Sequence, residues 1–142
     1  MKRQSSNIFI SLVTSLVLIV VSCREDIIMP ENIAGNVNEP LEVNHYNSYT
    51  FLLDAKKISV DYSRQADFTS LTSRISITIS DYSSGSVKFQ IRDNQLNSRF
   101  SYLGNKNVES YTEVLDGFVP ISVELQAANF TGKLKIQLSS VY

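Results

Sequence analysis

From about Tyr49 to the C-terminus, apolar and polar residues alternate with a period of two. The run Ile75–Ser80, with the sequence ISITIS, is the clearest case. Because successive side chains of a β-strand point to opposite faces, this period predicts strands with one apolar and one polar face. Antiparallel sheets allow one solvated face, whereas parallel sheets are usually covered on both. The same period occurs in the segments Ile58–Asp61, Val87–Arg92, Val119–Leu125 and Lys133–Leu138.

Turn-forming residues separate these alternating segments. Ser83–Gly85 and Gly104–Asn105 each follow an apolar run and predict chain reversals. Asp116–Gly117 is the strongest hairpin signal, because both central positions of a type I′ turn need positive φ. Pro120 cannot donate a hydrogen bond to a neighbouring strand, so its segment is predicted to be an edge strand or to carry a bulge.

The number and spacing of these segments indicate the fold class. We count about eight predicted strands and find no amphipathic helix. A single sheet would leave its apolar face in water, so two sheets are expected to pack face to face. We therefore predict an all-β domain, an antiparallel two-sheet β-sandwich of immunoglobulin-like or jelly-roll topology. The order of strands along the chain does not choose between these two topologies.

The N-terminus departs from this pattern and predicts an export signal. Lys2 and Arg3 precede Ile8–Val21, a run of 14 residues that contains no charge. A helix of that length rises about 21 Å, less than the roughly 30 Å of a membrane's hydrocarbon core. The segment therefore fits a signal peptide better than a membrane-spanning helix.

The residues that follow this run are Val20-Val21-Ser22-Cys23, and Cys23 is the only cysteine in the chain. This sequence resembles the lipobox of bacterial lipoproteins, a resemblance that covers about the first 23 residues. It implies cleavage between Ser22 and Cys23, and acylation of Cys23 with a diacylglyceryl group and fatty acids such as palmitate. Two or three acyl chains on one residue would anchor the protein stably in a membrane, which a single chain does not.

The resemblance also implies a location in the bacterial cell envelope, with the outer membrane favoured. Arg24, rather than Asp, follows Cys23, which by analogy argues against retention at the inner membrane. Glu25 and Asp26 resemble the acidic export signals of some surface-exposed lipoproteins. The periplasmic and surface faces of the membrane both stay open.

The stretch after Cys23 is acidic and rich in chain breakers. One basic residue and five acidic residues lie between Arg24 and Glu42, together with Pro30 and Gly35. Such a stretch predicts an extended, solvated tether. The predicted organisation is thus a cleaved signal peptide (1–22), a lipidated N-terminus and acidic tether (23–47), and a β-sandwich domain (48–142).

Composition limits the chemistry of this domain. The 142-residue chain is 43% hydrophobic and 19% charged, has a formal net charge of -1, and contains one His and no Trp. A basic nucleic-acid footprint is missing, so we expect no nucleic-acid partner. One Cys and one His exclude an internal disulfide, multi-Cys zinc sites and His-pair metal motifs. We expect no cofactor.

Few residues are candidates for catalysis or ligand binding. His45 is expected in an exposed loop. The acid pairs Asp81 with Asp93 and Glu109 with Glu113, together with Asp116, would suit glycoside hydrolysis only if held about 5 to 9 Å apart. Asp81 and Asp93 also close their predicted strands, where Asp is a common turn former. No calcium loop of the DxDxDG type occurs, so a Ca²⁺ site would need acids from distant loops. Possible aromatic platforms for a sugar are Tyr46, Tyr49, Tyr62, Tyr82, Tyr102 and Tyr111.

Three functions fit these observations. The first is a non-enzymatic, membrane-anchored envelope lipoprotein whose β domain binds a protein or glycan partner, and the missing catalytic residue types favour it. The second is a carbohydrate-binding or polysaccharide-processing accessory protein or enzyme, which requires converging acids in a cleft. The third is a structural spacer without a ligand. Among specific residues, we assign a role only to Ser22 and Cys23.

Overall fold

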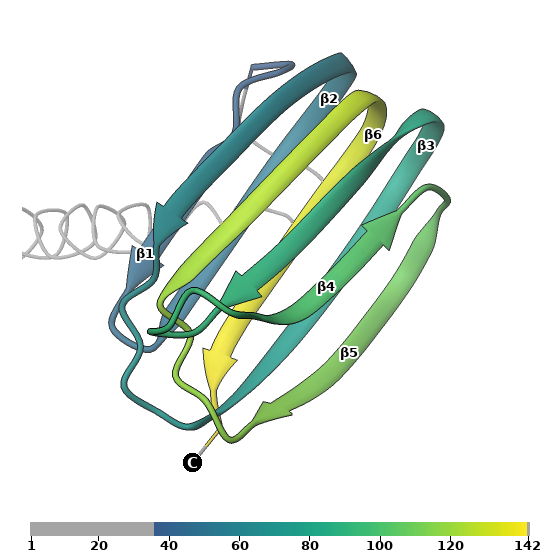
Figure 1. Ribbon diagram of the computed structural model, residues 1–142. Helices are drawn as coiled ribbons and strands as arrows, with labels where there is room; N and C mark the ends of the chain where they lie inside the picture. The colour runs from purple at the N-terminus through teal and green to yellow at the C-terminus, as the bar shows by residue number, and fades with distance from the viewer. Residues whose placement is uncertain (1–35, 142) are drawn as a thin grey trace, which may run out of the picture. The chain divides into compact units, whose positions relative to one another are not determined.

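The structure is a computed structural model and describes residues 36–141, which form one antiparallel sheet (Figure 1). The strand order is β1-β2-β6-β3-β4, and β5 also pairs with β3. No helix occurs in this part of the chain. The strands are β1 (Leu41–His45), β2 (Ser48–Gln65), β3 (Thr72–Arg92), β4 (Ser98–Gly104), β5 (Val108–Asp116) and β6 (Ser122–Ser140).

The three long strands β2, β3 and β6 bend near their middle (Figure 1). The pairing register shifts at these places, between Ala55 and Ile58 in β2 and between Ser80 and Ser84 in β3. Each bend contains residues with positive φ, a conformation that suits Gly and, less often, Asn or Asp. These residues are Lys57, Asp81, Gly85, Asn129 and Gly132.

The bends divide the sheet into two halves. The first half of β3 pairs with the second half of β6, with Ile77 opposite Ile136, and also with β5. The second half of β3 pairs with the first half of β6, with Phe89 opposite Leu125, and also with β4. Strand β2 divides in the same way along the other side of β6, and β1 pairs only with its first half.

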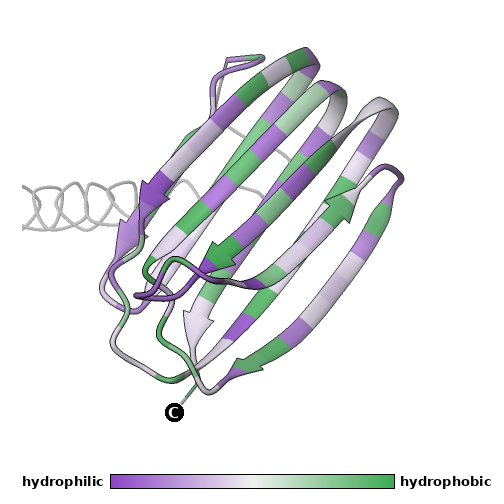
Figure 2. Cartoon of the chain, in the orientation of Figure 1, coloured by the Kyte–Doolittle hydropathy of each residue, from purple (hydrophilic) through white to green (hydrophobic). Residues whose placement is uncertain are grey.

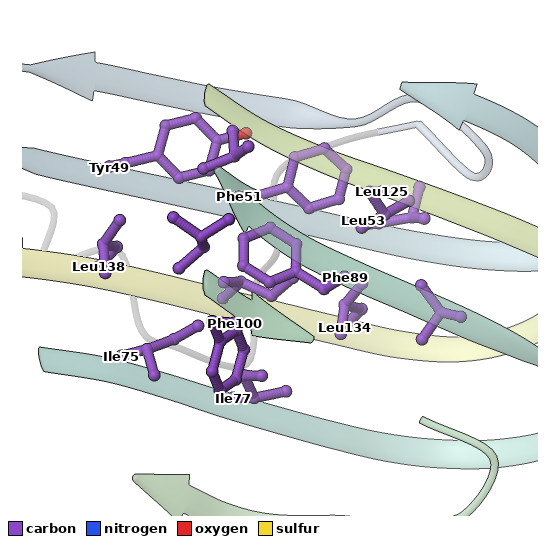
Figure 3. Packing of buried hydrophobic residues seen from close by; sticks show 14 of the residues in the cluster. Tyr49, Phe51, Leu53, Ile75, Ile77, Phe89, Phe100, Leu125, Leu134 and Leu138 are labelled. Atoms are coloured by element: carbon purple, nitrogen blue, oxygen red, sulfur yellow. The ribbon is translucent and has the colours of Figure 1, made fainter. Parts of the chain in front are cut away.

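The two halves of the sheet contribute side chains to a common core. Phe51 and Tyr62 lie eleven positions apart in β2, which is about 36 Å along a straight strand, yet their ring centroids are 5.3 Å apart. Phe100 of β4 and Tyr111 of β5 make a similar contact on the opposite side, at 6.3 Å. Figure 3 shows buried side chains from both halves in this cluster. Burial of this apolar surface is the main stabilising term of the fold.

The predicted alternation is confirmed in this core. Ile75, Ile77 and Ile79 are buried, whereas the residues between them are partly exposed, and Figure 2 shows the same banding along the other strands. The all-β, antiparallel character is therefore confirmed. The count of about eight strands was too high, because segments predicted as separate strands, such as Ile75–Ser80 and Val87–Arg92, are halves of one bent strand.

Two further predictions need correction. Pro120 lies outside the ladder, just before β6, and β6 is central rather than an edge strand. Strand β1 lies inside the range 23–47 that was predicted as tether. Its polarity is inverted: Leu41 and Val43 are 42% exposed, while Glu42 faces the same side as its buried partner Phe51. An inward-pointing charge is a known feature of edge strands, and here it hides the strand from a search for apolar alternation.

The chain reversals gather at two ends of the folded sheet. We call the end that contains the three bends the bend end. Hydrogen bonds join the β2 bend to Asn38, near the start of the described chain, and the β3 bend to Asn107 between β4 and β5. The bend end comprises residues 36–40, 56–58, 81–85, 105–107 and 129–132.

We call the opposite end the loop end. Backbone hydrogen bonds join its connections, from Asn47 to Asp67 and from Ile121 to Arg92. The C-terminal residues of β6 lie at the same end, since Ser140 donates to the Asn47 carbonyl (Figure 1). The loop end comprises residues 46–47, 66–71, 93–97 and 117–121.

Candidate ligand-binding site

A pocket of about 210 Å³ lies at the loop end. The β3–β4 loop forms one wall, the residues after β5 form another, and Leu71 contributes from the β2–β3 connection. Its lining contains both polar and apolar side chains, as does the lining of most small-molecule sites. Its lining residues are Leu71, Asp93, Asn94, Gln95, Arg99, Gly117, Phe118 and Val119.

Asp93 organises the wall that the β3–β4 loop forms. Its side chain is 4% exposed. One oxygen accepts hydrogen bonds from the backbone N–H groups of Gln95 (2.9 Å) and Asn97 (3.0 Å), and the other accepts one from Arg99 Nε (2.6 Å). Burial alone would raise the pKa of Asp93, but these hydrogen bonds together hold the pKa below its ordinary value. Asp93 is thus a turn-forming residue, one of the two roles that the sequence suggested.

A second arginine fixes the same loop from the side of the sheet. Arg92 makes two hydrogen bonds to the Glu124 carboxylate, at 2.7 and 2.9 Å, and its Nη1 donates to the Leu96 carbonyl at 2.8 Å. Leu96 itself has φ of 63°, which is uncommon for a residue with a side chain, and is 65% exposed. Two buried or partly buried ion pairs therefore hold a short loop in one conformation.

Arg99 brings a cation to the pocket. Its side chain is 49% exposed, and Nε is occupied by Asp93. Within residues 36–141, neither Nη group of Arg99 makes a hydrogen bond. A guanidinium carries five N–H donors, so the four on the Nη groups stay available. Phe118 and Val119 are half-buried and add apolar surface beside it.

The neighbouring connections at the loop end are also held by side chains. Asn47 is buried; its Oδ1 accepts from the Thr69 N–H at 2.8 Å, and its Nδ2 donates to Thr69 Oγ1. Tyr46 shares a hydrogen bond with the same hydroxyl at 3.0 Å, although 65% of Tyr46 is exposed. Leu71 is 60% exposed. Large apolar side chains thus project from three connections at this end, those of Tyr46, Leu71 and Leu96.

The acid pairs predicted as catalytic candidates are not brought together. Asp81 lies at the bend end, where it pairs with Lys133 at 2.8 Å, and Asp93 lies at the loop end. The seven strand residues Ser86–Arg92 separate the two acids by about 20 Å or more. Glu109 and Glu113 lie four positions apart on β5, about 13 Å. Neither pair has the spacing that glycoside hydrolysis needs.

The other candidates have structural partners or lie in solvent. Asp116 accepts a hydrogen bond from Thr72 Oγ1 at 2.7 Å. His45 is exposed at the end of β1. Of the six possible tyrosine platforms, only Tyr46 is exposed, and Tyr49 is fully buried. In the described part of the chain, no group of three His, Cys, Asp or Glu residues could hold a metal ion.

A polar cluster that the sequence did not suggest closes the edge between β1 and the second half of β2. The Glu42 carboxylate accepts hydrogen bonds from the Tyr62 hydroxyl and from Arg64 Nε, and the Arg64 guanidinium lies 4.4 Å from the centre of the Tyr62 ring. Burial and the bond to Glu42 raise the pKa of Tyr62 to about 12. Burial and the nearby Glu42 charge also raise the pKa of Tyr49. The one indication of this cluster in the sequence is Glu42, an acid that lies between two apolar residues, Leu41 and Val43.

Ser22 and Cys23, the residues predicted to mark the cleavage and lipidation site, lie outside the described residues. Within residues 36–141, no helix has the length and apolar character needed to span a membrane.

Comparison with known proteins identifies no family. No protein-family model matches the chain, and no curated protein matches it. Solved structures with a similar arrangement include tailspike protein 4 of bacteriophage CBA120 (11% identity, TM-score 0.42, 75% of this chain) and a Bacillus endospore appendage protein (15%, 0.42, 78%). A third is the carbohydrate-binding module CBM1 of BiXyn10A (11%, 0.35, 72%). The chain spans 18%, 99% and 74% of these three chains. At such low similarity they carry no argument about function.

Proposed function

We propose that this protein is a lipid-anchored module of the bacterial cell envelope that binds a partner through its loop end without catalysing a reaction. In this proposal the folded sheet is a β-sandwich of immunoglobulin-like or jelly-roll type. Cys23 carries the lipid, and residues from Arg24 to Pro40 link it to β1. Seventeen residues span at most about 60 Å when fully extended, so the domain can stand well clear of a membrane surface.

One observation carries the assignment of the binding end. The described chain begins at the bend end, where Asn38 bonds to the backbone of Lys56, and the pocket lies at the loop end. The half-strand Ser73–Ser80 runs between the two ends and is about 25 Å long. A domain linked through its bend end thus presents the pocket and the exposed side chains of Tyr46, Leu71 and Leu96 on the side away from the link.

Binding is favoured over catalysis by what lines the pocket. Asp93 has its carboxylate oxygens occupied by three hydrogen bonds, and the other candidate acids lie elsewhere. The remaining polar side chains in the wall are amides and a guanidinium, which recognise ligands by hydrogen bonds. An accessory protein of polysaccharide processing is the second candidate, favoured by the combination of Asn94, Gln95 and the Phe118 ring in one pocket.

The anchor is tested by Cys23→Ala. We expect the variant to incorporate no radiolabelled palmitate and either to leave the membrane fraction or to keep its signal peptide, whereas Ser5→Ala should behave as the wild-type protein does. Processing and membrane retention that are unchanged in Cys23→Ala would overturn the proposed anchor.

The binding end is tested by photo-crosslinking in cells that express the full chain. A photoreactive residue at Leu71 or Leu96 reports on the loop end, and one at Lys57 or Ser84 reports on the bend end; all four positions are exposed. We expect the two loop-end positions to give the same adduct and the bend-end positions to give none of it. An adduct confined to Lys57 and Ser84 would show that the assignment of the two ends is reversed.

A further inference from the structure

The size of the loop-end pocket limits its ligand. Pockets for drug-sized molecules occupy roughly 300–1,000 Å³, and this one has about 210 Å³. It therefore suits a ligand of about one ring, or one residue of a longer polymer, with the remainder of that polymer outside.

The Nη donors of Arg99 indicate an acceptor group on this ligand. Asp93 holds Nε at 2.6 Å and so fixes the plane of the guanidinium, while the Nη groups have no acceptor in the described part of the chain. A planar guanidinium binds a carboxylate through two parallel N–H···O bonds, which is among the strongest polar contacts in proteins. The Asp93 charge is in turn satisfied by two backbone N–H groups as well as by Arg99.

The other lining residues indicate which groups the rest of the ligand carries. The Asn94 side chain makes no hydrogen bond within residues 36–141, so both its donor and its acceptor are available, as is needed to bind hydroxyl groups. Phe118 is half-buried and brings an aromatic ring to the lining, and Val119 and Leu71 add apolar surface. A carboxylate, several hydroxyl groups and an apolar ring face on one small skeleton describe an acidic sugar.

The wall that carries these groups is set before any ligand arrives. Asp93 bonds to the backbone at Gln95 and Asn97, and Arg92 bonds to the Leu96 carbonyl. A loop held in this way loses little conformational entropy on binding. From these observations we infer that the pocket binds a carboxylate-bearing sugar unit, with Arg99 on the carboxylate, Asn94 on hydroxyl groups and Phe118 against the ring. This inference rests on the proposed function, in which the loop end is the binding end.

The test compares glucuronic acid with glucose, its neutral counterpart, by ligand-observed NMR and calorimetry on the full chain in detergent micelles. Hydrogen bonds to charged groups contribute about 1.5–3 kcal/mol, which converts to roughly 10- to 150-fold tighter binding of glucuronate than of glucose. Added salt should weaken glucuronate binding and leave glucose binding unchanged.

Four variants assign the roles. Arg99→Gln should reduce glucuronate affinity to that for glucose, and Arg99→Lys should recover part of the difference because it keeps the charge without the fork. Asn94→Ala should weaken both sugars several-fold; its side chain holds no other group of the described chain, so the fold should be unaffected. Leu103→Ser, at an exposed position of β4 outside both the lining and the loop end, is the control and should bind as the wild-type protein does. Thermal unfolding of each variant identifies any that fails to fold. If the Arg99 variants fail to fold, Asn94→Ala and the salt dependence of glucuronate binding by the wild-type protein still test the inference.

Three outcomes would overturn the inference: equal affinity for glucuronate and glucose, no binding of glucuronate, or binding only of an N-acetylated dipeptide with a free C-terminal carboxylate. The proposed function fails separately. If crosslinks form from Leu71 and Leu96 while no acidic sugar binds, the loop end is the binding end and the sugar assignment alone is wrong.

Discussion

The two ends of the folded sheet are built in different ways. At the bend end, backbone passes close to backbone: a Cβ added at Gly85, where φ is +79°, would lie 2.2 Å from the Asn129 carbonyl oxygen. At the loop end, Gly117 has nearly the same φ, +81°, but nothing lies within 4 Å of such a Cβ. Side-chain bonds from Asp93, Arg92 and Asn47 hold the connections of the loop end. Gly85 at the bend end therefore has no space for a side chain, whereas the loop end is held by a few polar groups and leaves room for a ligand.

The largest expected effect comes from the glycine comparison itself. Gly85→Ala forces a methyl group against the Asn129 backbone and should lower the free energy of unfolding by about 3 kcal/mol or more. A methyl group at Gly117 would contact no other atom, so Gly117→Ala should lower the free energy of unfolding only through the strain of positive φ, by about 1 kcal/mol. Urea denaturation of both variants measures the difference. Equal losses would show that close packing does not distinguish the two ends.

Alkaline pH tests whether the two ends share one cooperative core. Burial and a Glu42 hydrogen bond raise the pKa of Tyr62 to about 12; burial also raises the pKa of Tyr49 and Tyr102, and a Glu113 hydrogen bond raises the pKa of Tyr111. Above pH 10 the unfolded chain loses protons that the folded chain keeps, so stability is complete below about pH 10 and falls as the pH rises toward 12.

We therefore expect these four tyrosines to ionise late, in step with unfolding, when followed by phenolate absorbance and circular dichroism. N-acetyltyrosinamide, measured in the same buffers, provides the early reference. Complete ionisation of all tyrosines near pH 10 in a protein that stays folded would contradict the buried placement of this cluster.

Removal of the Asp93 charge should affect the loop end alone. The folded state lowers the pKa of Asp93, so its contribution to stability is complete above the ordinary carboxyl pKa and is lost as the pH falls through the lowered value. Asp93→Asn should reduce the melting temperature moderately at pH 7 and accelerate amide exchange at Gln95 and Asn97, with little change at the bend end. The difference from the wild-type protein should shrink in acid. Faster exchange throughout the sheet would mean that the loop is not an independent unit.

The smallest effect is expected where the loop end presents a side chain to solvent. Leu96→Ser removes a 65% exposed side chain, while the Leu96 carbonyl keeps its bond to Arg92. We expect a change within about 0.5 kcal/mol in the free energy of unfolding, measured by urea denaturation. A loss above about 1 kcal/mol would show that Leu96 packs on the domain rather than projecting from it.

The local part of this architecture is predictable from the sequence, and the long-range part is not. Alternation at Ile75–Ser80 identified a strand correctly, because this signal acts over a few residues. Asp116–Gly117 does end a strand, but the hairpin predicted there is wrong, since β5 pairs with β3 and not with β6. The bends were not predicted, because a run such as Ser80–Gly85 resembles a hairpin loop whether or not one strand continues through it. Strand β1 was not predicted because Glu42, rather than Leu41 or Val43, is its inward side chain.

The pocket also lies beyond local pattern. The pairing of β3 with β4 and β6 brings together Asp93, Arg99 and Phe118. The spacing of these residues along the chain does not predict that they line one pocket. Asp93 was noticed as a residue that closes a strand, and that role is confirmed. The proposed lipid on Cys23 stays a prediction from the lipobox alone.

The claim that the loop-end pocket binds an acidic sugar is tested most directly by amide hydrogen–deuterium exchange of the full chain in detergent micelles, with and without glucuronate. The account predicts slower exchange with glucuronate at residues 93–99 and 117–119, and unchanged exchange at 56–58, 81–85 and 129–132. Protection confined to the bend end, or no protection anywhere, would contradict it.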